Sequence, residues 1–314
     1  MVPLSFWIGF HAVLLVLLGL DLGVFHRRPH EVSFREAAVW SVVWVVVAIA
    51  FNWGVYVYMG PRHGLEFFTG YVIERALSID NIFVFVVVFA FFGVPAEFQH
   101  RVLFWGIFGA LVMRGAFIAA GAALLARFHW VNYVFGAFVL FTGVRFFFHK
   151  PEKVDVGRNP ALRLARRLLP VTEGYEGRSF LVKRGGQWLA TPLLLVLLVV
   201  ESVDVVFALD SIPSIFAVTQ SPFIVYTSNV FAILGLRASY FLLAALVPRL
   251  VYLSAGLATV LVFIGVKMLV EPWMQISIGV SLGVVVSALV LTTVASLLAP
   301  SRAAAGGRNA DESA

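Results

Sequence analysis

Residues 192–218 read PLLLVLLVVESVDVVFALDSIPSIFAV, an almost uninterrupted apolar run that contains three carboxylic acids. A helix needs about 20 apolar residues to cross the hydrocarbon core of a bilayer, and this run is longer. The rest of the chain has the same character, since 61% of its 314 residues are hydrophobic and only 13% are charged. Soluble domains carry about twice that charged share. The sequence therefore predicts an all-α, polytopic helical membrane protein.

Nine apolar stretches are long enough to span the membrane, and their length favours helices over the short alternating strands of a barrel. We expect spans at 4–25, 37–58, 66–93, 101–124, 130–149, 191–218, 223–246, 250–270 and 275–298. The chain then divides into two N-terminal helices (1–58), a three-helix unit (66–149), a basic loop (150–190), a second three-helix unit (191–270), a final helix (275–298) and a disordered tail (299–314).

The basic residues indicate the orientation. Sixteen Lys and Arg residues fall in connections on one side of the expected spans, and only Arg62 and Arg127 fall on the other. The positive-inside rule then places the N-terminus outside and the C-terminus in the cytoplasm. Because topology accounts for the net charge of +6, nucleic-acid binding is not indicated. Within the basic loop, residues 160–169 alternate leucines with arginines, which predicts a short amphipathic helix on the inner leaflet or a solvated helical turn.

Two segments of the chain repeat each other. Residues 74–82 read ERALSIDNI and residues 204–212 read DVVFALDSI, so each has an acid, an aspartate six residues later, a small polar residue and isoleucine. The echo continues from TGVR (142–145) to IGVK (264–267). Each unit has three helices, an odd number, so the second copy enters the membrane from the opposite face. This is the inverted repeat of many secondary transporters, unless the similarity between apolar helices is due to chance.

Five carboxylates lie well inside the expected spans, and each costs about 2.5–3.5 kcal/mol at a helix centre. These are Glu74, Asp80, Glu201, Asp204 and Asp210, with Asn81 and Ser211 beside them as further oxygen donors. The intramembrane cations nearby are Arg75, Arg114 and Arg237. If all were ionised, the deficit of two charges would match one divalent cation.

Helix geometry adds a constraint, because residues six apart diverge by about 120° on an ideal helix. Glu74 and Asp80 therefore do not face one point unless the helix is interrupted, and Pro213 favours an interruption near Asp210. We expect unwound backbone near the midplane. The alternative is that the acids form structural salt bridges, Asp80 with Arg114 and Asp210 with Arg237.

Long polar blocks within the spans give the chain a family resemblance. They are LDLGVFHR (20–27), TGYVIE (69–74), LSIDNIF (77–83), VPAEFQHRVLFW (94–105), LLPVT (168–172), FALDSIP (207–213) and TSNVFAILGLR (227–237). In these blocks the sequence resembles the TerC family of integral membrane proteins. The resemblance implies a bacterial inner-membrane protein associated with manganese efflux and, by name, with tellurium resistance, whose functional acids fall on the five carboxylates above.

The donor chemistry suits a hard cation. Carboxylate, amide and hydroxyl oxygens bind Mn²⁺, Mg²⁺ or Ca²⁺, whereas softer metals prefer His or Cys. The chain has no cysteine, which excludes thiol redox chemistry and gives no support for direct handling of tellurite. We expect no tightly bound cofactor, and the metal, most simply Mn²⁺, is a transported ion.

Enzymes need a reacting group, and the motifs HExxH, GxGD and Walker A are all absent from the sequence. We therefore predict a secondary carrier that exports Mn²⁺ in exchange for protons, rather than an enzyme. The alternative is a non-transporting membrane scaffold that recruits membrane or secreted proteins in a stress response. The sequence gives no oligomeric state.

Overall fold

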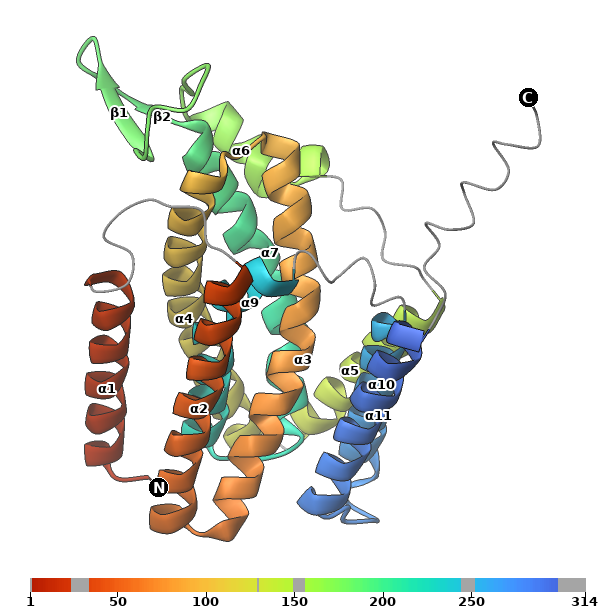
Figure 1. The fold of residues 1–314 in the computed structure, drawn as a ribbon. Helices are drawn as coiled ribbons and strands as arrows, with labels where there is room; N and C mark the ends of the chain where they lie inside the picture. Colours follow the sequence, from red (N-terminus) through yellow and green to blue (C-terminus); the bar gives the residue numbers. More distant parts are fainter. Residues whose placement is uncertain (1, 24–33, 129, 149–155, 244–251, 299–314) are drawn as a thin grey trace.

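The computed structural model describes residues 2–23, 34–128, 130–148, 156–243 and 252–298, and these are almost entirely helical (Figure 1). Its long apolar helices are α2 (Phe34–Met59), α3 (Pro61–Phe92), α4 (Ala96–Arg127), α5 (Trp130–Phe148), α7 (Pro192–Phe216), α10 (Leu253–Val270) and α11 (Ile278–Leu298). The remaining helices are α1 (Leu4–Gly23), the 3₁₀ turn η1 (Val156–Arg158), α6 (Pro160–Leu168), α8 (Pro222–Leu234) and α9 (Leu236–Leu243). The expected all-α membrane fold is confirmed.

The nine expected spans correspond, within the described residues, to seven helices of membrane length and two further apolar helices, α1 and α8. The expected span 223–246 differs most, because its chain is divided at Gly235 between α8 and α9. The last residues of that span, and the tail expected to be disordered at 299–314, lie outside the described residues. The three-helix unit and its inverted copy remain predictions.

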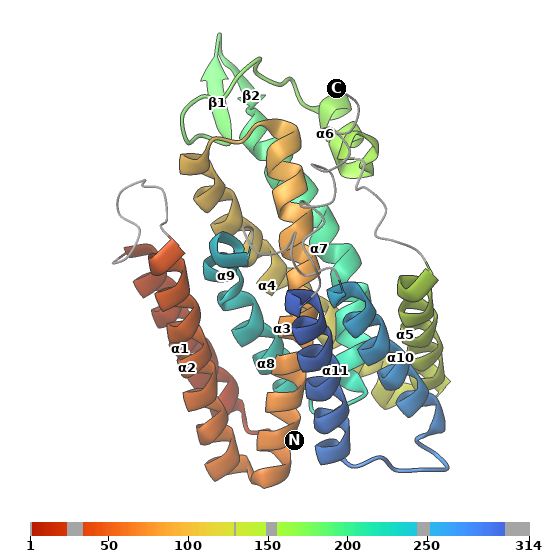
Figure 2. The same cartoon turned by 45° about the vertical axis from the view of Figure 1, so that its right-hand side comes forward.

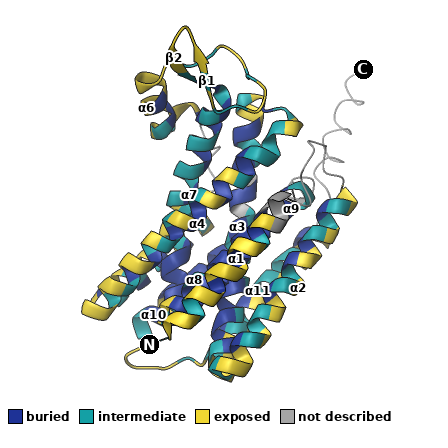
Figure 3. Ribbon diagram, turned by 90° about the vertical axis from the view of Figure 1, so that its left-hand side faces the viewer, coloured by how far each residue is buried: buried dark blue, intermediate teal, exposed yellow. Residues whose placement is uncertain are grey.

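Helix α2 has one face that is buried in the protein and another that is exposed. Its small residues Ala37, Ser41 and Ala48 are buried, whereas Val46 and Trp53 on the other side are exposed. The same division runs along the other outer helices, which present exposed faces outward and buried faces inward (Figure 3). Small residues let helices approach closely where lipid provides no hydrophobic driving force between them. The exposed apolar faces suit a lipid bilayer.

Helices α3 and α7 form the centre of the bundle. Helix α3 packs against α2, α7, α8 and α11, and α7 packs against α3, α4, α5 and α6. Both helices are continuous through their acidic motifs, so the expected unwinding near the midplane is wrong. Pro213 lies within the last turn of α7, and the Ser214 hydroxyl donates to the carbonyl of Asp210 at 2.8 Å. Pro213 removes the hydrogen bond that a backbone nitrogen would donate to the Leu209 carbonyl, but α7 continues through it to Phe216.

The break in the backbone lies instead at Gly235, between α8 and α9. Ending α8 at Leu234 frees carbonyl oxygens of its last turn. The Arg75 guanidinium donates to one of them, the carbonyl of Ala232, at 3.1 Å, and also to the hydroxyl of Ser239. A side chain at Gly235 would meet Arg75, since an added Cβ would lie 2.8 Å from its Nη1. Arg75 thus supplies hydrogen-bond donors at the turn between α8 and α9.

Helices α5 and α10 pack through glycines that the sequence repeat pairs. A Cβ added at Gly143 would lie 2.7 Å from the backbone nitrogen of Val262, and one added at Gly265 would lie 2.5 Å from that of Leu140. Each glycine therefore admits the backbone of the opposite helix. The two helices thus meet at glycines that the sequence similarity aligns.

The connection between the two units folds at one end of the bundle, opposite the α2–α3 junction (Figures 1 and 2). Helix α6 begins at Pro160, which confirms the expected helix, while its place on the leaflet stays a prediction. A hairpin of β1 (Leu181–Arg184) and β2 (Gln187–Ala190) follows, with Arg184 paired to Gln187. The sequence reading missed it, although the pair Gly185–Gly186, both at positive φ, is the signal for a two-residue hairpin turn.

Candidate functional site

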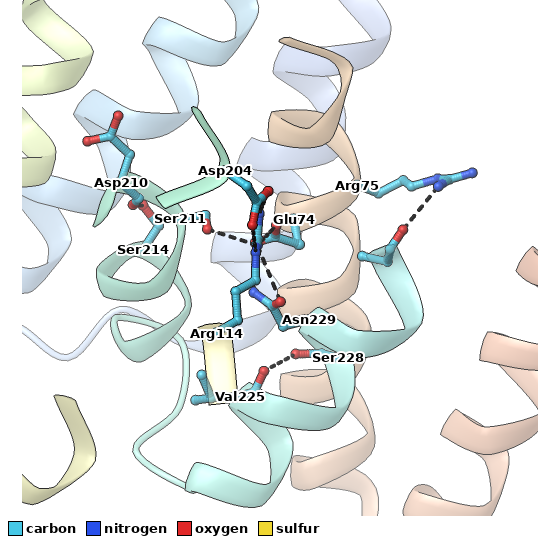
Figure 4. Close-up of polar contacts among 11 residues, drawn as sticks. Glu74, Arg75, Arg114, Asp204, Asp210, Ser211, Ser214, Val225, Ser228 and Asn229 are labelled. Carbon is cyan, nitrogen blue, oxygen red and sulfur yellow. Dashed lines mark hydrogen bonds and ion pairs between the residues drawn. The ribbon is translucent and has the colours of Figure 1, made fainter. Parts of the chain in front are cut away.

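Arg114 of α4 lies at the centre of the candidate site and is 1% exposed. Its Nη1 forms an ion pair with Glu74 of α3. Its Nη2 and Nε donate to the two carboxylate oxygens of Asp204 on α7, at 3.1 Å and 3.3 Å. Figure 4 shows the guanidinium between the two acids. One cation therefore bridges the first acid of each repeated motif.

A second set of polar groups surrounds this bridge. Nη1 of Arg114 also donates to Ser211 Oγ and Asn229 Oδ1, both at 3.3 Å. Asn229 Nδ2 in turn donates to the second oxygen of Glu74 at 3.0 Å. Both Glu74 oxygens are thus bonded, as a fully buried carboxylate requires. Sequence reasoning missed Asn229, although three successive polar residues, 227–229, interrupt the apolar run there.

A small cavity adjoins the bridge. The space open to the centre of a water molecule is about 20 Å³, enough for one water or one bare ion. Its polar lining is Glu74, Asn81, Arg114, Asp210 and Ser211, and its apolar lining is Leu77, Phe146, Phe207 and Leu261. Two of the acids expected to bind a metal, Glu74 and Asp210, therefore meet at one cavity with both expected supporting donors, Asn81 and Ser211.

Two oxygen atoms that belong to residues lining this cavity accept few hydrogen bonds. Asp210 Oδ1 accepts from the hydroxyl of Thr142 on α5 at 3.2 Å. Asn81 is 2% exposed, and its Oδ1 finds no hydrogen-bond partner among the described residues. A buried carbonyl oxygen without a donor is costly, and a cation or an ordered water in the cavity would satisfy it. The donor set of carboxylate, amide and hydroxyl oxygens suits a hard cation.

Glu201 lies apart from the cavity, three residues before Asp204 in α7. Its carboxylate packs directly against Gly109 of α4, where any side chain would overlap it. Its Oε2 is buried and has no hydrogen-bond partner within the described part of the chain. Glu201 thus occupies the α4–α7 interface rather than the cavity lining.

The four expected acids whose side chains are described do not all line one cavity. In the described side chains, no three His, Asp or Glu residues converge as a metal-binding group. The side chains of Asp80 and Arg237 lie outside the described residues, so the expected pairs Asp80–Arg114 and Asp210–Arg237 are not seen there. Those two pairs stay predictions, and among the described side chains Arg114 pairs with Glu74 of α3 and Asp204 of α7.

Comparison with known proteins gives a consistent family signal. A protein-family model described as "Integral membrane protein TerC family" matches residues 59–304. An uncharacterized membrane protein of Myxococcus xanthus is 52% identical over 93% of this chain and 92% of its own. Proteins named "Putative membrane-bound redox modulator Alx" are similar too: that of Salmonella typhi is 47% identical over 92% of both chains, and that of Escherichia coli (strain K12) is 46% identical over 91% of this chain and 92% of its own. No solved structure matches.

Proposed function

This chain belongs to the TerC family of integral membrane proteins, and within that family we propose that it is a secondary carrier of a hard divalent cation. The observation that carries the proposal is the cavity between α3, α4 and α7, which Glu74, Asn81, Asp210 and Ser211 line. Ionisable residues buried in membrane helices are costly and, by default, functional. A cation passing through this cavity gives them a role.

The proposed substrate is Mn²⁺, with Ca²⁺ and Mg²⁺ as the alternatives that the same oxygen donors accommodate. Mn²⁺ is the first ion to test because the family resemblance implies manganese efflux. Imidazole and thiolate ligands, which would favour Zn²⁺ or Cu⁺, are not among the cavity-lining residues of the described chain.

The proposed direction is export from the cytoplasm in exchange for protons. Moving a dication outward against an inside-negative potential costs about 4.6 kcal/mol per 100 mV, twice the value for one charge. The sequence has no nucleotide-binding motif to supply this energy. Carboxylates that bind either a metal or protons couple the two flows, since each displaces the other.

The proposed orientation places the hairpin end in the cytoplasm of a bacterial cell, with the inner membrane as the location. Gly174 is a suitable probe because a side chain there would meet open space. The native chain has no cysteine, so a Gly174→Cys variant labels at one position only. We expect a membrane-impermeant maleimide to label it in inverted vesicles and not in intact spheroplasts, and the reverse pattern would overturn the topology and the inverted repeat.

The alternative is a non-transporting membrane scaffold, and one observation favours it. The hairpin exposes Leu181 (49%) and Trp188 (62%), apolar side chains that suit contact with a partner protein. The relatives named redox modulators fit such an indirect role better than a chemical one, because this chain has no cysteine for thiol redox chemistry.

Flux through proteoliposomes that contain only this protein distinguishes the two. We expect Mn²⁺ entry, read by quenching of an enclosed fluorophore, to depend on the protein and to disappear in Asp210→Asn. The matched control is Glu173→Gln, which changes an exposed acid outside the bundle and should retain the flux. Wild-type vesicles without flux of Mn²⁺, Ca²⁺ or Mg²⁺ would refute the carrier and leave the scaffold.

A further inference from the structure

We propose that Arg114 is a tethered cation that competes with the transported metal for Glu74, pivoting on Asp204 when the metal enters. This inference rests on the proposed carrier function. It assigns different tasks to two acids that the sequence treats as equivalent: Glu74 passes from arginine to metal, and Asp204 retains the arginine.

The hydrogen bonds of Arg114 divide into two groups. Nε and Nη2 both bind Asp204, a two-point contact that fixes the plane of the guanidinium. Nη1 alone binds Glu74, Ser211 and Asn229. A rotation about the Asp204 contact would therefore release these three groups together while Asp204 stays bonded.

Two of the three released groups, Glu74 and Ser211, line the cavity, whereas Asp204 does not. Glu74 and Ser211 face it together with Asn81 and Asp210, and Arg114 forms part of the same wall. While Nη1 holds Glu74, the positive charge of the guanidinium lies beside the space that a dication would occupy. Like charges at contact distance in a desolvated site repel strongly. Metal entry and the Arg114–Glu74 contact thus exclude each other.

The formal charges fit this exchange. Glu74 and Asp204, the two acids that Arg114 touches, contribute two negative charges when ionised, and Arg114 contributes one positive charge. The single positive charge of the guanidinium therefore does not balance the negative charges of the two carboxylates that it binds. A cation in the cavity beside Glu74 would add positive charge that Arg114 does not supply.

Arg75 provides a matched comparison. It is a neighbouring arginine within the same bundle, but its hydrogen bonds among the described residues go to the Ala232 carbonyl and the Ser239 hydroxyl, not to a carboxylate. In Figure 4 it points away from the cluster around Arg114. Removing its charge therefore tests what loss of a buried arginine does without freeing an acid.

The experiment measures Mn²⁺ binding to the purified full chain in detergent, by the electron paramagnetic resonance signal of free Mn²⁺. When a binding-competent form is only partly populated, apparent affinity falls by that fraction. We expect Arg114→Met to bind Mn²⁺ roughly tenfold more tightly than wild type, and to release it more slowly. Arg114→Lys should also bind more tightly, because an ammonium keeps the charge but lacks the planar fork that spans both acids. Arg75→Met should stay within about twofold of wild type, because Arg75 holds no acid.

The Arg114→Lys variant distinguishes competition for Glu74 from a general electrostatic effect of the positive charge. Tighter binding in Arg114→Met with unchanged binding in Arg114→Lys would mean that only the charge matters, and would overturn the proposal. Unchanged or weaker binding in both folded variants would overturn it as well. If Arg114→Met does not insert, Arg114→Lys decides alone, since an unchanged affinity there contradicts displacement. Wild type that binds none of Mn²⁺, Ca²⁺ or Mg²⁺ would instead refute the carrier function itself.

Discussion

The two units of the sequence repeat carry the same acidic motif, yet the helix that follows it differs. In the first unit α4 is unbroken, and its Arg114 reaches both Glu74 and Asp204. In the second unit the equivalent stretch is divided at Gly235, and Arg75 from the first unit covers the break. Arg114 and Arg75 both come from the first unit, and one binds the two acids while the other binds at the turn after α8. Similar motifs set where the acids lie, but the polar partners make the site asymmetric.

The largest expected effect tests whether the asymmetry extends to the second acid of each motif. Asp210 lines the cavity, and the repeat pairs it with Asp80. We expect Asp80→Asn and Asp210→Asn each to abolish Mn²⁺ flux in proteoliposomes, because each removes an ionised oxygen donor for a dication. Retained flux in Asp80→Asn alone would mean that the two motifs have diverged in function.

The next effect concerns stability and compares the two buried arginines. Arg114→Met leaves two buried carboxylates without their cation, a change that typically costs about 3–5 kcal/mol. Arg75→Met removes a donor from the Ala232 carbonyl, while the Ser239 hydroxyl keeps its hydrogen bond to the Gly235 carbonyl, and about 1–3 kcal/mol is expected. Unfolding in mixed micelles should rank the variants in this order, and equal losses would show that the acids are stabilised by other groups.

Added metal sharpens that comparison. If a dication replaces the missing guanidinium charge, saturating Mn²⁺ should recover more stability in Arg114→Met than in Arg75→Met, because only the first has acids left unpaired. The same titration on wild type provides the reference. An identical shift in all three proteins would show that metal binds independently of the Arg114 site.

Much of this site could be predicted because charge in an apolar helix is conspicuous. The positions of Glu74, Asp210 and Arg114 stand out in the sequence, and Asn81 and Ser211 follow from their place beside the aspartates. The pairing could not be predicted, since which acid faces which arginine depends on how helices rotate against one another. Helix periodicity does not specify that rotation.

The local backbone was harder to predict for a related reason. Pro213 suggested a break in α7, but the helix continues through it to Phe216. No local signal pointed to Gly235, yet α8 ends there and Arg75 donates to the carbonyl of Ala232 in its last turn. Such compensation comes from another helix, 157 residues away in sequence, and local propensity does not contain it.

A smaller effect tests whether α5 and α10 meet as equivalent partners. Gly143→Ala and Gly265→Ala would each place a methyl group against backbone of the opposite helix, and overpacking of this kind costs about 1–3 kcal/mol. Gly283→Ala in α11 meets open space and is the matched control. Losses of similar size at 143 and 265 support a symmetric contact, whereas a loss at one position only would show that the helices are not equivalent.

The smallest expected effect concerns the connection between the two units. This connection is hydrogen-bonded to α7, the first helix of the second unit. Asn159 caps α6, since its Oδ1 accepts from the backbone nitrogens of Ala161 and Leu162 at 2.9 Å and 3.2 Å. Its Nδ2 donates to Ser202 Oγ of α7 at 2.9 Å. Loss of such a cap costs about 1 kcal/mol.

We expect Asn159→Ala to speed hydrogen exchange in α6 roughly fivefold, the factor that about 1 kcal/mol of local opening gives. Ser202→Ala removes the contact with α7 but leaves the cap, so its effect on α6 should be smaller. Because Ser202 lies between Glu201 and Asp204 in sequence, Mn²⁺ flux measured on both variants asks a further question. Flux that changes in Ser202→Ala but not in Asn159→Ala would place the cause in α7 itself, whereas equal changes would show that α6 must stay docked on the second unit during transport.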